Sequence, residues 1–244
     1  MIFTKDKLNF LNDIKDIINK ELFSVEEYVD KINNLIEDNL LNKKGFLRVY
    51  LEGEAYLGKS SIVKKIAENF PRCNFIRIDL KEYQSSFDIN KLIGTTQGYV
   101  GYNDAHIFSK LKNNNFAIIL FDNYSSAHQS IKDLIKEILK EKTIIDNKGE
   151  KIYFNNSFIF ITDDTCSNNK VGFDNQSEEK NQNELYDLVD SVINFSKLSK
   201  ETLVNYLTAK KVVNKEAILK ESNYEKYNYK NIEKLIKENL VVNS

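Results

Sequence analysis

The stretch that decides the fold runs, from residue 46 to residue 60, Phe46-Leu47-Arg48-Val49-Tyr50-Leu51-Glu52-Gly53-Glu54-Ala55-Tyr56-Leu57-Gly58-Lys59-Ser60. Its first part is mostly apolar, which is typical of a buried strand in a parallel sheet. Its second part, Gly53 to Ser60, fits the pattern G-x-x-x-x-G-K-S and leads into a helix-like segment. A strand, this motif and a helix in that order predict a P-loop, in which backbone N–H groups and a helix N-terminus cradle phosphates.

The P-loop pattern assigns chemistry to individual residues. Lys59 is expected to neutralise the β- and γ-phosphate oxygens, and Ser60 is expected to ligate Mg²⁺. Glu54 is unusual here, because its carboxylate repels phosphate unless the side chain points away. A chance glycine-rich turn is the alternative to a nucleotide pocket. The sequence favours the pocket, with ATP and Mg²⁺ as cofactors, and its nucleotide-binding residues are Gly53, Glu54, Ala55, Tyr56, Leu57, Gly58, Lys59 and Ser60.

A second acidic position is expected where a neighbouring strand ends. The apolar run at 116–121 is followed by Asp122 and Asn123. Asp122 would hold Mg²⁺ through water, so Ser60 and Asp122 form the predicted metal site. The next position normally carries a carboxylate that polarises the attacking water, and the amide of Asn123 cannot accept a proton. The sequence therefore predicts metal binding beside an impaired hydrolytic position.

The remaining chain alternates strand-like and helix-like segments, which predicts a three-layer α/β fold with a parallel sheet. Residues 142–155 instead resemble a hairpin that turns at Asn147-Lys148-Gly149. Residues 163–183 are polar and predict a long exposed loop. Further strands are expected at 75–78, 116–121, 158–161 and 189–195, and helices at 59–69, 105–112 and 128–141.

Helices are also expected at both ends of the chain. Leu8, Leu11, Ile14 and Ile18 lie at helical spacing, and a second apolar stripe follows from Val25 to Leu40. Ser24 and Glu27 fit a capping box at the start of that second helix. These stripes favour packing in the core over a groove for a partner. A further helical pattern begins after Ser199.

Composition and charge exclude several classes of protein. Hydrophobic residues make up 41% of the 244 residues, which excludes a wholly disordered chain. Lys and Arg total 35 and Asp and Glu total 36, a balance that argues against nucleic acid as a partner. Cys73 and Cys166 form no metal motif and indicate a reducing compartment. No apolar run approaches about 18 residues and no signal peptide is evident, so the chain is expected to be cytoplasmic, with no membrane partner.

Several segments together resemble one known family, the Clp-type AAA+ unfoldases, and above all the second ATPase module of the two-ring members. The resemblance extends over roughly residues 10 to 208. It implies an AAA+ P-loop fold with a helical N-terminal extension at 1–45, an α/β core at 46–198 and a shortened helical lid at 199–244. The segments that carry it are Arg77-Ile78-Asp79-Leu80-Lys81-Glu82-Tyr83, Leu92-Ile93-Gly94-Thr95-Thr96-Gln97-Gly98-Tyr99-Val100-Gly101-Tyr102, Ala127-His128, Phe154-Asn155-Asn156 and Leu198-Ser199-Lys200-Glu201.

The resemblance gives two loops an expected role. In that family Gly98-Tyr99-Val100-Gly101 would be the pore loop, whose tyrosine grips an unfolded polypeptide threaded through a hexameric ring. A tyrosine packed on its own domain is the alternative. Val171-Gly172-Phe173 is similar to the aliphatic-Gly-Phe tripeptide with which some Clp unfoldases dock on a Clp-type peptidase. A loop anchor that packs on its own domain is the alternative there.

Three departures from the family concern hydrolysis. Asn123 replaces the catalytic glutamate, Asp164 replaces the sensor asparagine, and Leu188 occupies the position of the arginine finger. No arginine follows Arg77, so neither a finger nor a second sensor arginine exists in the C-terminal half, although Lys226 lies near the latter position. Loss of a finger alone costs a factor of about 10³–10⁵ in turnover. The resemblance therefore implies a degenerate module, and no residue is assigned a catalytic role.

Three functions remain open at this level. The first is a Clp-like nucleotide-binding module with little or no hydrolysis, which acts in protein remodelling as a ring subunit, adaptor or regulator. The second is an active ATP-driven protein unfoldase. The third is an interaction protein that has lost nucleotide binding. The expected partners are other AAA+ ring subunits, in a homo- or hetero-oligomer, a polypeptide substrate and a Clp-type peptidase.

Overall fold

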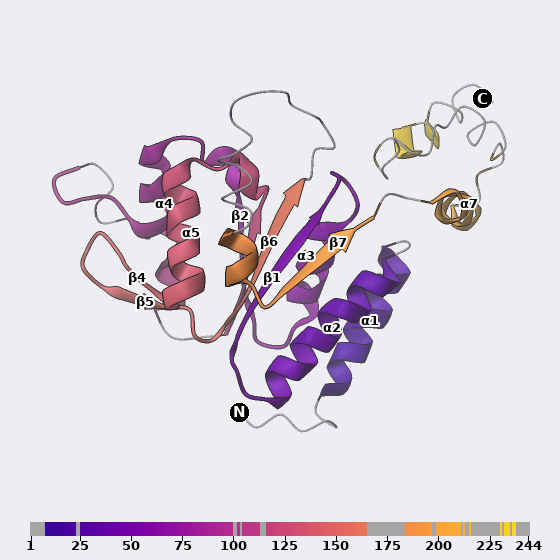
Figure 1. Cartoon of the computed structure of the whole chain (residues 1–244), viewed down its shortest axis with the longest axis horizontal. Helices are drawn as coiled ribbons and strands as arrows, with labels where there is room; N and C mark the ends of the chain where they lie inside the picture. Colours follow the sequence, from indigo (N-terminus) through magenta and orange to yellow (C-terminus); the bar gives the residue numbers. More distant parts are fainter. Residues whose placement is uncertain are drawn as a thin grey trace.

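A parallel sheet forms the centre of the computed structural model (Figure 1), which describes residues 8–22, 25–99, 102, 104–112, 116–164, 184–196, 199–210, 212, 215, 230, 232–234, 236 and 237. Among these residues, five strands pair in the order β2-β3-β6-β1-β7, and every neighbouring pair runs parallel. The three-layer α/β fold is confirmed. The strands are β1 (Phe46–Gly53), β2 (Asn74–Asp79), β3 (Ala117–Asp122), β6 (Ser157–Asp164) and β7 (Ser191–Phe195).

Helices cover both faces of this sheet, as Figure 1 shows. Because successive residues of a strand point to opposite faces, β3 supplies Ile118 and Leu120 to one core and Ile119 and Phe121 to the other. The first core is completed by α1 (Asn9–Glu21), α2 (Glu26–Leu41) and α3 (Lys59–Asn69). The second core is completed by α4 (Ile89–Ile93) and α5 (Gln129–Glu141).

The N-terminal helices share their core with the sheet. Ile14 and Ile18 of α1 and Ile32 and Ile36 of α2 are almost fully buried. Burial of such a side chain contributes about 1.5–3 kcal/mol. The two apolar stripes are therefore core, as expected. The start of α2 differs from the prediction: its N-cap is Val25, with no side-chain cap bond, and Ser24 lies outside the described residues.

Most other predicted elements are present. The hairpin consists of β4 (Thr143–Ile145) and β5 (Lys151–Tyr153), and α7 (Lys200–Ala209) follows Ser199, whose Oγ accepts from the Thr202 N–H at 3.0 Å. The helix predicted at 105–112 is present as a shorter 3₁₀ helix, Ile107–Leu111. Its first carbonyl, that of His106, accepts from both the N–H and the hydroxyl of Ser109, which fixes the tighter turn.

Short helical turns connect the sheet to its covering helices. The short helix α4 and a helical turn at 184–188 were not predicted.

Within the described residues, no helix combines the length and the apolar character that crossing a membrane would need.

Candidate functional site

The loop from Gly53 to Ser60 joins the end of β1 to the start of α3. Gly53 has φ +141°, and a Cβ built there would lie 2.4 Å from the carbonyl oxygen of Phe195 in the neighbouring strand. Gly58 has φ +94° and caps α3. Both positions need a backbone that glycine adopts without strain. Tyr56 also has a positive φ, of 64°, so the loop holds a bulky residue in the left-handed region.

Lys59 is buried at the base of this loop, with 5% of its surface exposed. Its Nζ donates to the carbonyl oxygens of Gly53 at 2.7 Å and Glu54 at 2.6 Å. A third bond reaches Asp164 Oδ1 at 3.1 Å. Burial lowers the pKa of Lys59, and the nearby Asp164 opposes that shift. The ammonium is thus surrounded by acceptors at the point where the loop closes.

Asp122 is the centre of a buried hydrogen-bond cluster. Its Oδ1 accepts from Ser60 Oγ at 2.6 Å and from Thr162 Oγ1 at 2.5 Å, and its Oδ2 accepts from Arg77 Nη2 at 2.6 Å. Burial alone would raise the pKa of Asp122, but these bonds outweigh it and the pKa is lowered. An ionised carboxylate beside a hydroxyl is the hard oxygen donor set that suits Mg²⁺, so the residues present fit this ion.

Asn123 follows Asp122 in a left-handed conformation, with φ 64°. Its Nδ2 donates to Asp79 Oδ1 at 2.9 Å. Asp79 ends β2 in register with Asp122 of β3, so the two carboxylates stand at the same edge of the sheet. The amide at position 123 therefore lies beside a carboxylate contributed by another strand.

These side chains surround one cavity of about 270 Å³. It brings together most of the predicted P-loop residues, the predicted metal ligands Ser60 and Asp122, and the changed positions Asn123 and Asp164.

Leu188 lies elsewhere: it is half-buried in the 184–188 turn and packs against the core under α5. Sequence reasoning missed Arg77, Asp79 and Lys81, although the carboxyl-end rule that found Asp122 applies equally to β2. The lining consists of Ala55, Tyr56, Leu57, Gly58, Lys59, Ser60, Ser61, Arg77, Asp79, Lys81, Asp122, Asn123 and Asp164.

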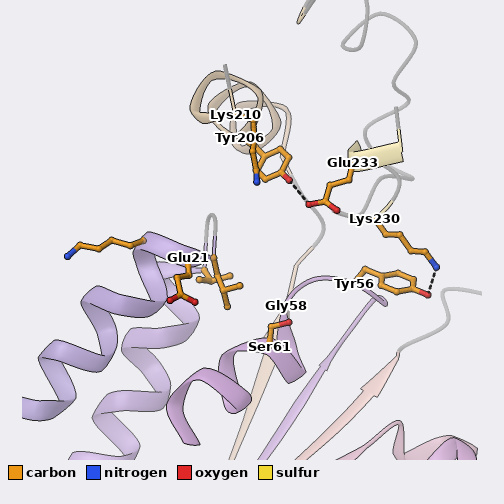
Figure 2. A pocket seen from close by; sticks show the side chains of 11 residues that line it. Glu21, Tyr56, Gly58, Ser61, Tyr206, Lys210, Lys230 and Glu233 are labelled. Atoms are coloured by element: carbon orange, nitrogen blue, oxygen red, sulfur yellow. Dashed lines mark hydrogen bonds between the residues drawn. The ribbon is translucent and has the colours of Figure 1, made fainter. Parts of the chain in front are cut away.

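A larger cavity of about 570 Å³ adjoins the first and shares Tyr56, Gly58 and Ser61 with it. Figure 2 shows that it lies between the end of α1, the P-loop and α7. Lys230 Nζ stands 4.6 Å above the centre of the Tyr56 ring and donates to its hydroxyl at 3.1 Å. Tyr206 donates to Glu233 at 3.2 Å. The two cavities together provide a polar end and a wider, half-apolar end.

Gly98 and Tyr99 of the predicted pore loop do not line either cavity. Tyr99 is 72% exposed, which excludes it from the core of its own domain, and Gly98 beside it has φ +94°. Val100 and Gly101 lie outside the described residues, as do Val171, Gly172, Phe173 and Lys226. His128 caps α5 through Nδ1, which accepts from the Ser130 N–H at 3.2 Å.

Residues 46–198 match the family model described as AAA domain (Cdc48 subfamily). The chain belongs to this AAA family. The match begins at β1 and contains the whole sheet, so it includes the P-loop, Asp122 and the 184–188 turn. Together with the relatives below, it identifies a Clp-type AAA+ module, as the resemblance implied.

Relatives of this AAA module include three Clp proteins. The chain is 26% identical to the chaperone protein ClpB of Malacoplasma penetrans, over 92% of this chain and 33% of the relative. It is 25% identical to the chloroplastic chaperone protein ClpC of Pisum sativum, over 77% and 22%. It is 33% identical to the Clp protease ATP-binding subunit ClpL of Staphylococcus aureus, over 52% and 18%. The chain thus spans a third or less of the length of these curated relatives.

A solved structure shows the same fold. The closed state of Hsp104 with ATPγS and FITC casein aligns with a TM-score of 0.74 and 18% identity, over 97% of this chain and 47% of that one. At this identity the likeness establishes the arrangement of helices and strands, and no more.

Proposed function

We propose that this chain binds Mg-ATP and hydrolyses it slowly or not at all, and that it serves protein remodelling as a ring subunit, adaptor or regulator. The observation that carries the proposal is one cavity that contains Lys59, Ser60 and Asp122 together with Asn123 and Asp164. The first three side chains suit phosphate and metal binding, and the last two cannot perform the steps that their positions imply.

Binding is supported by charge and shape. The cavity at Lys59 offers an ammonium, the N-terminus of α3 and the donors of a glycine-bounded loop, all of which favour phosphate. The adjoining cavity is wide enough for a nucleoside, and Tyr56 stands at the boundary between the two. Relatives are described as ATP-binding, and Hsp104 was solved with ATPγS, which agrees with this assignment.

Slow hydrolysis is supported by three side chains. The Asn123 amide cannot accept a proton from water. Asp164 brings a carboxylate within 3.1 Å of the Lys59 ammonium, so it competes with phosphate for that charge. Arg77 lines the cavity, but its guanidinium is already paired with Asp122 at 2.6 Å. No arginine later in the sequence can supply a finger.

Action on polypeptide is supported by Tyr99. An exposed aromatic ring beside a glycine can contact any sequence, since it needs only apolar area and close approach of the backbone. The Hsp104 structure contains casein, which is consistent with such a role in this fold. Docking through Val171-Gly172-Phe173 to a Clp-type peptidase ring stays a prediction from the sequence.

An active unfoldase is the second candidate, and one contact favours it. Asp79 lies 2.9 Å from the Asn123 amide nitrogen and lines the same cavity, so a carboxylate is available close to the position of the lost glutamate. Robust turnover by the wild-type chain that disappears in Asp79→Asn would favour this candidate over the first.

The test is calorimetric titration of the chain with Mg-ATP, alongside measurement of phosphate release. We expect ATP to bind and Lys59→Ala to weaken binding at least about 100-fold, because the phosphate charge loses its buried counter-ion. Lys64→Ala is the matched control, since Lys64 lies on the same helix with an exposed side chain. Absence of binding at millimolar ATP would contradict the proposal and favour an interaction protein without nucleotide.

A further inference from the structure

The loop that carries Tyr99 is tied together at its base. This Tyr99 loop, residues 94–106, leaves α4 and returns to the 3₁₀ helix at Ile107. At its end, His106 Nδ1 donates to the carbonyl oxygen of Leu92, just before its start, at 2.8 Å. Gly94 has φ +91°, and a Cβ there would lie 3.5 Å from the His106 ring. The imidazole therefore bridges the two ends of the loop.

The turn of the β4–β5 hairpin holds the same loop from the side. Three successive turn residues each contact a different part of it. Asp146 Oδ2 lies 3.3 Å from His106 Nε2, at the end of the loop. The Asn147 N–H donates to Ile93 O at 3.0 Å and its side chain donates to Gly94 O, at the start. Lys148 Nζ lies 5.3 Å from the centre of the Tyr102 ring, in the middle.

The β4–β5 turn holds its conformation without His106, because Asp146 has other hydrogen-bond and ion-pair partners. Its carboxylate is fully buried and accepts from the N–H groups of Lys148 at 2.9 Å and Glu150 at 2.8 Å. Lys112 Nζ adds an ion pair at 3.0 Å. Burial alone would raise the pKa of Asp146, but these partners lower it to about 2, so the carboxylate is ionised at neutral pH.

The tip of the loop is held by backbone bonds within the loop itself: the Tyr99 N–H donates to Thr96 O at 3.2 Å, and the Tyr102 N–H donates to Tyr99 O at 3.3 Å. Tyr99 is 72% exposed, and no atom lies within 4 Å of a Cβ built on Gly98. These bonds shape the tip, whereas the contacts at the base, on Leu92 and Gly94, hold the loop against the rest of the domain. We propose that His106 and the turn Asp146–Lys148 form a clamp that fixes the direction in which Tyr99 is presented to a polypeptide. His106 is then a positioning residue. The inference rests on the polypeptide role proposed for Tyr99.

The test separates the two contacts of the imidazole, Nδ1 with Leu92 O and Nε2 with Asp146 Oδ2. His106→Phe removes both and keeps a ring, His106→Asn keeps a donor near the place of Nδ1, and His106→Gln keeps one near Nε2. Lys110→Ala, an exposed change on the same 3₁₀ helix, is the control. Hydrogen exchange is followed in peptides of the Tyr99 loop and of β1 and β3. A photo-crosslinking residue at position 99 reports capture of fluorescein-labelled casein.

We expect His106→Phe to speed exchange in the Tyr99 loop about tenfold, as expected for the loss of one or two hydrogen bonds, with β1 and β3 unchanged. Capture of casein should fall several-fold in the same variant, and His106→Asn should restore most of both signals. Unchanged exchange in the loop would overturn the clamp, as would an equal rise in β1 and β3, or faster loop exchange with undiminished capture. Absence of capture by the unsubstituted His106 chain would count against the role of Tyr99, and exchange would still decide the clamp.

Discussion

The two halves of the small cavity use their side chains differently. In the phosphate half, defined by Lys59, Ser60 and Asp122, each group is buried or half-buried. Lys59 donates to the backbone, and Ser60 donates to Asp122, which also accepts from Thr162. In the hydrolytic half, defined by Asn123 and Asp164, each side chain is bound instead to a neighbour of complementary polarity: Asn123 to Asp79 and Asp164 to Lys59. The first half presents groups suited to phosphate and metal, and the side chains of the second are bound to neighbouring residues, among them Lys59 of the first half.

This difference shows which parts of such a site depend on the fold. The phosphate half is built from a turn between β1 and α3 and from the last residue of β3, so it persists as long as the sheet does. The hydrolytic half depends on single side chains at strand ends, which change without disturbing the core. A change that removes hydrolysis and keeps binding would therefore disturb such a fold less than one that removes binding.

The largest effect is expected where the backbone itself forms the phosphate half. Gly53→Ala would bring a Cβ against the Phe195 carbonyl, 2.4 Å away, and we expect the free energy of unfolding to fall by about 3 kcal/mol or more. Gly149→Ala is the control: it also has a positive φ, but no atom lies within 4 Å, so only about 1–2 kcal/mol is expected. Urea unfolding measures both. Equal losses would mean that the contact with β7 does not constrain the loop.

The second-largest effect is expected from acid, which should remove the hydrogen bonds that Asp122 accepts in the phosphate half. The folded-state pKa of Asp122 is lowered, so its bonds to Ser60, Thr162 and Arg77 stabilise the fold above the unfolded pKa, near 3.9, and are lost as pH falls through the folded pKa. We expect the urea midpoint to fall below about pH 4 more steeply in the wild type than in Asp122→Asn. Parallel pH profiles would show that Asp122 does not contribute to this acid sensitivity.

Much of the fold is predictable because a buried strand of a parallel sheet is a short, mostly apolar run of residues, which the sequence shows directly. The five apolar runs became the five strands, and the helix predicted at 59–69 has the observed bounds. The 3₁₀ helix at Ile107–Leu111 was not predictable from periodicity. Its shape is set by the Ser109 bonds to His106 and by the place of His106 between Leu92 and Asp146, which is far away in sequence.

The residues of the candidate site also divide into those that a local sequence pattern predicts and those that only the tertiary structure brings together. Lys59, Ser60 and Asp122 were found because a motif and a strand end encode them. Asp79 could have been found by the strand-end rule, but its bond to Asn123 depends on the pairing of β2 with β3. The approach of Lys230 to Tyr56 joins residues that no local pattern links. Sequence patterns specify which groups are present, and tertiary packing specifies which groups meet.

A smaller effect, on nucleotide affinity, is expected from a substitution at Asp164 in the hydrolytic half. Asp164→Asn removes a carboxylate beside Lys59, so we expect affinity for Mg-ATP to rise about fivefold, equivalent to about 1 kcal/mol of relieved repulsion. Affinity for Mg-ADP should change less, because ADP lacks the γ-phosphate. Asp13→Asn, on the exposed side of α1, controls for the change in net charge. Equal gains for ATP and ADP would contradict the expectation that Asp164, beside Lys59, repels the γ-phosphate in particular. Titration calorimetry measures these affinities.

The smallest effect is expected from placing a glutamate at position 123. Asn123→Glu puts a second carboxylate beside Asp79 and a poor left-handed residue at φ 64°. The combined change Asn123→Glu with Asp79→Asn exchanges carboxylate and amide and keeps the pair bonded. A base contributes a factor of about 10²–10⁴ only within a complete constellation, and catalytic effects are not additive.

Since no arginine follows Arg77, we expect phosphate release by either variant to stay within about tenfold of the wild type. The assay uses saturating Mg-ATP, with Lys59→Ala as the background. A rise of about a hundredfold or more in the exchanged pair alone would show that the base was the one missing element. Such a result would also mean that the difference between the two halves of the cavity rests on a single side chain.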